Sequence, residues 1–531
     1  MPDQVNHSAA KVLHRPPQLM EEKADKSTPS TTFTPRSSGI LLHISSLPSR
    51  YGVGDFGAAQ AWLKRLQEAG QSWWQMLPLG PPGAGDSPYQ CFSAFAGNPD
   101  LISPDLLIAD GLLSKSDLRA PGFPESRVDY PRVRQFKRRF LSAAFERFSI
   151  RRSSQLQDEF TAFASANANW LDDYALFMAI KEARPAISWM DWPKDLARRK
   201  KFAIASSNHE LRDSIKRLKF KQFIFFRQLE TLRERAKEAG VRLIGDLPIF
   251  ISDESSDVWA NPHLFLLDRN RRPKFVAGVP PDCFSCTGQR WGNPVYNWRA
   301  MKADGFRWWM DRTRTALVQA DLVRLDHFRG FAAYWQIPAE NPTAEFGRWA
   351  RSPGGELFEK INQAMKNLPF IAEDLGLITP DVERLRDRFG MPGMRVLQFG
   401  FGASDNPHSP HNYVGNCIAY TGTHDNDTTV GWWKSLERDK QREIERYVPG
   451  ATGDIAWTLM RLAWASVAGI AIAPMQDILR RGTSARMNMP GTGTGNWQWR
   501  MPVSALNERW TEPLAELTET YGRAQSTGDP K

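Results

Sequence analysis

Residues 210–250 read ELRDSIKRLKFKQFIFFRQLETLRERAKEAGVRLIGDLPIF, and this stretch decides the fold class. Residues 210–239 place apolar side chains at spacings of three, four and seven, which predicts an amphipathic helix. Gly240 follows where a helix C-cap is expected, and the apolar run at 241–250 predicts a buried strand. The stretch therefore predicts a helix that leads directly into a strand.

Seven further short runs share this strand pattern, because each is rich in β-branched or aliphatic residues and ends in polar residues, Gly or Pro. They lie at 39–46, 72–80, 321–328, 370–376, 394–402, 417–426 and 469–477. Further helical patterns fit 55–69, 344–366, 380–389 and 453–468. Strands that alternate with helices pair in parallel through right-handed crossovers, and eight such units can close a barrel. We therefore expect an α/β fold, a (β/α)8 TIM barrel.

The spacing of these runs also predicts how the chain is divided. Residues 1–38, rich in Ser, Thr, Pro and Lys, are expected to form a flexible N-terminal tail, and 39–515 to form the barrel. The helix-rich stretch at about 81–210 is too long for one repeat unit, so we interpret it as insertions after the second strand. Residues 516–531 are expected to be a C-terminal tail.

Composition excludes several classes of protein. Of 531 residues, 41% are apolar and 24% are charged, which is typical of a globular protein with a sizeable core. Four Cys cannot form a disulfide framework, so a reducing compartment, the cytoplasm, is expected. No apolar stretch is long enough for a transmembrane helix, and acidic residues in 1–38 argue against a secretory signal or a transit peptide.

The net charge of +10 has a local origin. Residues 131–240 hold 24 Lys and Arg against 13 Asp and Glu, which leaves the rest of the chain close to neutral. Two interpretations remain open: solvated helix faces, which the sequence favours, or a site for a polyanion. The segment has no Gly-rich phosphate loop and no nucleic-acid module signature.

Acidic residues stand at the ends of three predicted strands. They are Asp326 in RLDHF, Glu373 in IAEDLG and Asp425 in GTHDN. Because barrel enzymes gather reactive groups at the carboxyl ends of their strands, these acids are expected to face one rim. A pair of carboxylates about 5 to 5.5 Å apart is what a retaining glycosidase uses. The alternative is that they are salt-bridged or capping carboxylates, and the flanking Asp374 and Asp427 fit the pattern as well.

Longer strings resemble a known family. The segments are SPYQCFSAFAGNP (87–99), VAGVPPDCFSCTGQRWGNPVYNW (276–298), RLDHFRGFAAYW (324–335), IAEDLGLITP (371–380), YTGTHDNDTTVGWW (420–433) and ARMNMPGTGTGNWQWR (485–500). They closely resemble the 4-α-glucanotransferase family, also called amylomaltase or disproportionating enzyme, of the α-amylase-like superfamily. The resemblance runs from about 39 to 515.

The resemblance implies roles for individual residues. Asp326 corresponds to the nucleophile, and Arg324 pairs with it and keeps it ionised. Glu373 corresponds to the general acid/base. Asp425 corresponds to the residue that binds sugar hydroxyls and supports the transition state, with His424 beside it. On spacing alone, His424 could equally be a core histidine.

The resemblance also implies substrate contacts. Trp291 and Tyr89 suit stacking on sugar rings, although an isolated Trp is more often a core residue. The lid-like loop at about 276–292 carries Phe284, and Asp246 is expected to be architectural. Polar contacts to sugar hydroxyls are expected from Ser87, Asp282, Gln289 and Asn496.

Two departures from the family pattern stand out. Ala84 replaces a Tyr associated with a second glucan-binding groove, which puts that groove in doubt. Cys283 precedes Phe284 where the family commonly has Tyr, and with Cys286 it forms a CxxC. Because this CxxC lies in a Pro/Gly-rich loop and has no second CxxC, we interpret it as incidental rather than as a redox or metal motif.

Together these features predict an enzyme that moves an α-1,4-glucan segment to the 4-hydroxyl of an acceptor through a covalent intermediate on Asp326. An α-amylase-like hydrolase and a non-catalytic glucan-binding protein are the alternatives. Expected partners are maltooligosaccharides, α-1,4-glucans and glucose as acceptor, with no metal, cofactor, nucleic acid or membrane. A monomer or a weak homodimer is expected.

Overall fold

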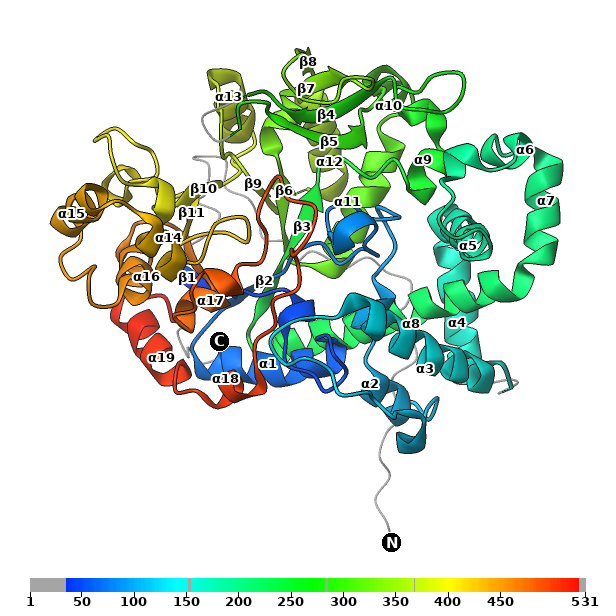
Figure 1. The fold of residues 1–531 in the computed structure, drawn as a ribbon, viewed down its shortest axis with the longest axis horizontal. Coiled ribbons are helices and arrows are strands. Elements are labelled where there is room, and N and C mark those ends of the chain that lie inside the picture. Colours follow the sequence, from blue (N-terminus) through cyan, green and yellow to red (C-terminus); the bar gives the residue numbers. More distant parts are fainter. Residues whose placement is uncertain (1–34, 151–153, 282–284, 367, 525–531) are drawn as a thin grey trace, which may run out of the picture.

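The computed structural model describes residues 35–150, 154–281, 285–366 and 368–524, and its centre is a closed barrel of eight strands (Figure 1). The strands pair in parallel in the order β1-β12-β11-β10-β9-β6-β3-β2. This confirms the predicted fold class, and each of the eight predicted runs overlaps one barrel strand. The strands are β1 Ser37–Leu41, β2 Trp73–Gln75, β3 Arg242–Pro248, β6 Leu322–Asp326, β9 Phe370–Ala372, β10 Gly393–Val396, β11 Cys417–Tyr420 and β12 Ile470–Pro474.

The register between β3 and β6 places charged residues side by side. Asp246 lies opposite Arg324, and Pro248 lies opposite Asp326. Because side chains alternate along a strand, Arg324 and Asp326 lie on the same face of β6. The pairing therefore brings Asp246, Arg324 and Asp326 together at the carboxyl end of two neighbouring strands.

Helices cover the barrel strands and fill the connections. The predicted helix at 210–239 is α8, and Gly240 follows it with φ of 69°, in the left-handed region that suits glycine at a helix end. At the other end of a helix, the Asp55 side chain caps α1 by accepting from the N–H groups of Gly57 and Ala58. The helices outside the insertion are α1 Phe56–Glu68, α8 Arg212–Glu238, α9 Ser256–Ala260, α10 Trp298–Ala303, α11 Arg307–Gln319, α12 Gly354–Met365, α13 Pro380–Arg388, α14 Thr429–Ser435, α15 Arg438–Tyr447, α16 Ile455–Ala465, α17 Met475–Ile478, α18 Val503–Asn507 and α19 Thr511–Thr520.

A helical insertion follows β2, as predicted, and lies to the right of the barrel in Figure 1. Aromatic side chains of α3, α4 and α5 pack on α8; Phe148, for example, contacts Phe220 with ring centroids 4.7 Å apart. The insertion helices are α2 Pro104–Ala109, α3 Tyr130–Ile150, α4 Gln155–Ala166, α5 Ala168–Ala183, α6 Lys194–Ala197 and α7 Lys201–Glu210.

A second, antiparallel sheet corrects one expected helix. The sheet has the order β5-β4-β7-β8 and lies at the top of Figure 1. Residues 344–366 were expected to form one helix; 354–365 do form α12, but 348–351 form β8, which pairs with β7. The pairing of β8 with β7 outweighs the helix propensity of this stretch. The strands are β4 Phe275–Val279, β5 Gln289–Pro294, β7 Ala333–Pro338 and β8 Arg348–Arg351.

Both ends of the described fold extend past the expected boundaries of the barrel segment. Strand β1 begins at Ser37, and α19 continues to Thr520. Arg523 is fully buried, so the chain remains packed beyond 515. Among the described residues, no helix is long and apolar enough to cross a membrane.

Candidate active site

One guanidinium group joins two carboxylates at the ends of β3 and β6. Nη1 of Arg324 donates to both carboxylate oxygens of Asp246 at 2.8 and 2.6 Å, and Nη2 donates to Oδ1 of Asp326 at 2.9 Å. Arg324 is 3% exposed, whereas the side chain of Asp326 is 26% exposed. Asp246, expected to be architectural, therefore orients the cation that contacts Asp326.

The ionisation of Asp326 reflects two opposing effects. Burial raises its pKa to about 7, and the positive charge of Arg324 counteracts that rise. Arg324 thus contacts Asp326, and its charge favours the ionised carboxyl; that it keeps Asp326 ionised stays a prediction. Desolvation is the larger of the two effects, so the pKa of Asp326 lies above that of a free carboxyl.

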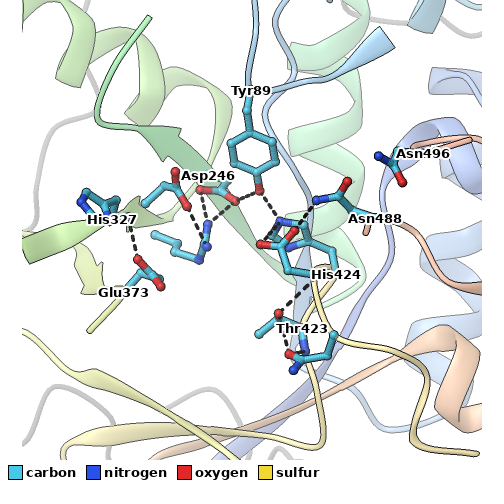
Figure 2. Close-up of polar contacts among 12 residues, drawn as sticks. Tyr89, Asp246, His327, Glu373, Thr423, His424, Asn488 and Asn496 are labelled. Atoms are coloured by element: carbon cyan, nitrogen blue, oxygen red, sulfur yellow. Dashed lines mark hydrogen bonds and ion pairs between the residues drawn. The ribbon is translucent and has the colours of Figure 1, made fainter. Parts of the chain in front are cut away.

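Glu373 follows β9 and contacts the chain just after Asp326. The backbone N–H of His327 donates to Oε2 of Glu373 at 2.7 Å (Figure 2). His327 adopts the left-handed conformation, with φ of 51°, a conformation that non-glycine residues seldom adopt. Burial raises the pKa of Glu373 well above its ordinary value, which favours the protonated form of this carboxyl.

A chain of polar contacts links Asp246 to the loop after β11. The Tyr89 hydroxyl lies 2.7 Å from Oδ2 of Asp246 and 2.9 Å from Nε2 of His424. Nε2 of His424 also lies 3.3 Å from Oδ2 of Asp425. Burial lowers the pKa of His424, so the ring is neutral. Because the hydroxyl donates its one proton to Asp246, the bonding pattern assigns the His424 proton to Nε2.

Asn488 completes the surroundings of Asp425 and was not among the predicted site residues. Its side-chain nitrogen donates to Oδ1 of Asp425 at 2.6 Å (Figure 2). Arg486 donates to the backbone carbonyl of Asp425 at 2.6 Å. Both residues lie in the segment at 485–500 that resembles the family, which was the only sequence signal for them.

A pocket opens beside His424 at the carboxyl ends of β1, β2, β11 and β12. It encloses about 430 Å3, open solvent included. His43 lies in its wall with Nδ1 buried, and burial lowers the pKa of His43 to about 3. Its remaining lining residues include Leu41, Leu77, Thr423, Asn426, Asp427 and Met487.

Tyr89 and Trp291 already make ring contacts with histidines. Tyr89 stacks on His424 with centroids 5.3 Å apart, and Trp291 meets His327 edge to face at 4.8 Å. Trp291 also donates from Nε1 to Gln289 Oε1 at 3.2 Å. Trp291 is half-buried, so it is neither a core residue nor fully exposed.

The remaining predicted residues are Ser87 and Asn496, which hold turns of the backbone, and residues of the expected lid-like loop. Ser87 Oγ accepts from the Tyr89 N–H at 3.2 Å, so it fixes the turn that carries Tyr89. Asn496 accepts from the Met489 N–H at 3.0 Å and holds the loop that contains Asn488. Cys286 is exposed and free. Asp282, Cys283 and Phe284 lie outside the described residues.

The flanking acids have structural partners. Asp374 is 5% exposed and accepts from Arg386 at 2.5 Å and from the Met394 N–H at 2.7 Å. Asp427 accepts from the Thr428 N–H at 2.7 Å and from the Thr483 hydroxyl at 2.8 Å. These contacts give Asp374 and Asp427 structural roles, and the choice of Asp326, Glu373 and Asp425 as reactive groups stays a prediction.

Comparison with known proteins gives a consistent result. Residues 42–505 match the family described as 4-alpha-glucanotransferase. The 4-alpha-glucanotransferases of Thermus thermophilus and of Synechocystis sp. are each 48% identical, covering 92% of this chain and 99% and 98% of theirs. The solved amylomaltase of Streptococcus agalactiae in complex with acarbose is 40% identical and superposes with a TM-score of 0.89, covering 92% of this chain and all of that one.

Proposed function

The chain belongs to the 4-alpha-glucanotransferase family and has that activity, EC 2.4.1.25, and from this premise we propose that it works by a retaining double displacement on the β3, β6, β9 and β11 rim. The contact of Arg324 with both Asp246 and Asp326 is the observation that supports this most strongly. Arg324 gives Asp326 a cationic partner, which suits a nucleophile. Glu373, whose pKa is raised, is then the proton donor.

In the first step, a carboxylate oxygen of Asp326 attacks the anomeric carbon of the donor glucan. The bond to the glycosidic oxygen breaks as Glu373 transfers its proton to that oxygen, and the shortened glucan leaves. The donor segment is then held as an ester on Asp326, and Glu373 is a carboxylate. Tyr89, His424 and Asp425 line the same rim and are proposed to hold the sugar.

In the second step, Glu373 takes the proton from the 4-hydroxyl of an acceptor glucose or glucan. That oxygen attacks the anomeric carbon, and the ester to Asp326 breaks. Two inversions give retention. Transfer exceeds hydrolysis because a positioned hydroxyl acts at a high effective concentration compared with free water.

Trapping the intermediate tests this mechanism. An α-maltosyl fluoride needs no proton on its leaving group, so Glu373→Gln should form the ester and then stall without a base. Mass spectrometry should locate a maltosyl group on the peptide that contains Asp326, and Asp326→Asn should carry none. A label on another peptide would assign the nucleophile elsewhere.

Incubation with maltotriose separates transfer from hydrolysis. We expect glucose and longer oligomers with a constant number of reducing ends. A rise in reducing ends without longer products would contradict transfer to a sugar acceptor.

A further inference from the structure

The local basic excess is largely neutralised inside the helical insertion. Arg134 contacts Asp86 and Asp100, Arg147 contacts Asp117, and other cations of the insertion also have carboxylate partners. Such pairs account for charge that would otherwise attract an anion. Cations of this surface that have no carboxylate partner are therefore the ones available to bind an anion.

Arg119 and Arg139 are exposed, and no carboxylate among the described residues lies within ion-pair distance of either. Both line one hollow, which we call the Arg119 hollow. It encloses about 780 Å3, open solvent included, and its wall consists of Arg119, Ala120, Pro121, Arg132, Gln135, Phe136 and Arg139. Three guanidinium groups thus border a single concave surface.

Helix α3 forms one side of this hollow. Residues 132, 135, 136 and 139 are three, four and seven positions apart, so they lie on one face of the helix. The segment 119–121 forms the other side, and Phe136, only 3% exposed, is the buried floor. The cations therefore come from two separate parts of the chain.

Arg132 is held in place beside the hollow. It donates to the Gly122 carbonyl at 2.9 Å, and its guanidinium lies over the Phe123 ring at 5.5 Å. Asp129, whose Oδ2 lies 3.8 Å from Arg132 Nη1, is the one carboxylate that an ion pair joins to these three arginines within the described chain. The hollow therefore keeps a net positive charge.

We propose that the Arg119 hollow is a binding site for a phosphate group, either inorganic phosphate or the phosphate ester of a sugar. Guanidinium groups match the oxygens of phosphate in pairs, and several of them converging on one anion is a common arrangement. A neutral glucan is a poorer fit, because the ring of Phe136 is buried and offers no face for stacking. The proposal is independent of the transferase mechanism.

Calorimetric titration of the full chain at low ionic strength tests the site. Inorganic phosphate and glucose 6-phosphate should bind saturably, and added NaCl should weaken the binding. Arg119→Ala combined with Arg139→Ala should lower the affinity about tenfold or more, because both guanidinium contacts are lost. Equal affinities for inorganic phosphate and glucose 6-phosphate would show that the site recognises the phosphate group alone. Tighter binding of glucose 6-phosphate would show that the site recognises a sugar phosphate.

The matched control removes two exposed cations that do not line the hollow. Arg138 lies on the same helix α3, and Lys216 lies on α8. Arg138→Ala with Lys216→Ala has the same charge loss and should keep the affinity. Transfer from maltotriose should be unchanged in both double variants. Absence of saturable binding, an equal loss in the control, or glucose binding as tightly as its phosphate would overturn the proposal.

Discussion

Arg324 pairs with two carboxylates through one guanidinium group, and its loss should change the pH dependence of the reaction. Arg324 lowers the pKa of Asp326 against the effect of burial. In Arg324→Met that pKa should therefore rise above about 7. Because the ionised form of Asp326 is the nucleophile, the acid limb of kcat/KM against pH should move to higher pH. Arg324→Lys, which keeps the charge, should move it less; an acid limb identical in all three proteins would show that Asp326 does not set it.

Asn488 provides a second residue-scale prediction. Its side chain donates to Asp425 at 2.6 Å, and a hydrogen bond to a charged group contributes about 1.5–3 kcal/mol. Asn488→Ala should therefore lower kcat/KM roughly 10- to 100-fold. Asn488→Asp should be worse, since it places a second negative charge against Asp425. Circular dichroism and steady-state transfer from maltotriose check both variants, and kinetics unchanged in Asn488→Ala would exclude a role in orienting Asp425.

The sequence located individual acids better than the contacts between them. Asp326 and Glu373 were predicted because each ends a short apolar run, and a strand end is a local signal. The contact of Asp246 with Arg324 depends on the β3–β6 register, which a one-residue slip would abolish. Asn488 lies in a loop with no periodicity, so no local pattern could have connected it with Asp425.

At the scale of elements, Asp374 anchors β9 to β10 immediately after Glu373. It accepts from the Met394 N–H and from Arg386, and a Cβ on Gly393 would approach Asp374 Oδ2 to 2.3 Å, so this approach requires glycine. Asp374→Ala leaves the Met394 N–H without its acceptor and removes a carboxylate from the half-buried Arg386 and Arg395, so it should lower the free energy of unfolding by about 2–4 kcal/mol. Because Glu373 is the adjacent residue, kcat should fall as well.

Chemical denaturation measures this effect, and Glu359→Ala is the control. Glu359 pairs with Arg388 at the surface, where loss of an ion pair costs roughly 0–1 kcal/mol. An equal cost for both variants would show that Asp374 is not an anchor.

Element prediction succeeded where the signal was local. The barrel strands and the helix at 210–239 each carry their own periodicity, whereas β8 is defined by pairing with β7. Trp349 in β8 contacts Trp335 in β7 with centroids 5.3 Å apart, and this cross-strand contact favours a strand within a stretch whose spacing fits a helix. The wrong part of the expected helix thus marks a strand that pairs with β7 across the short connection 339–347, a pairing that helical spacing does not reveal.

For the whole molecule, the C-terminal segment fastens the junction where β1 meets β12. Fully buried Arg523 donates to the carbonyls of Ser37, Ser466 and Ala468, each at 2.9 Å. Residues 516–531 were expected to be a tail, because nothing in their local sequence signals a partner 486 positions away. Arg523→Ala leaves several buried carbonyls unpaired and should lower the free energy of unfolding by about 3 kcal/mol. Removal of everything after 515 should cost at least as much, whereas exposed Glu519→Ala should cost almost nothing. Thermal unfolding of the three variants checks this, and a melting temperature for Arg523→Ala equal to that of Glu519→Ala would show that the barrel closes without this contact.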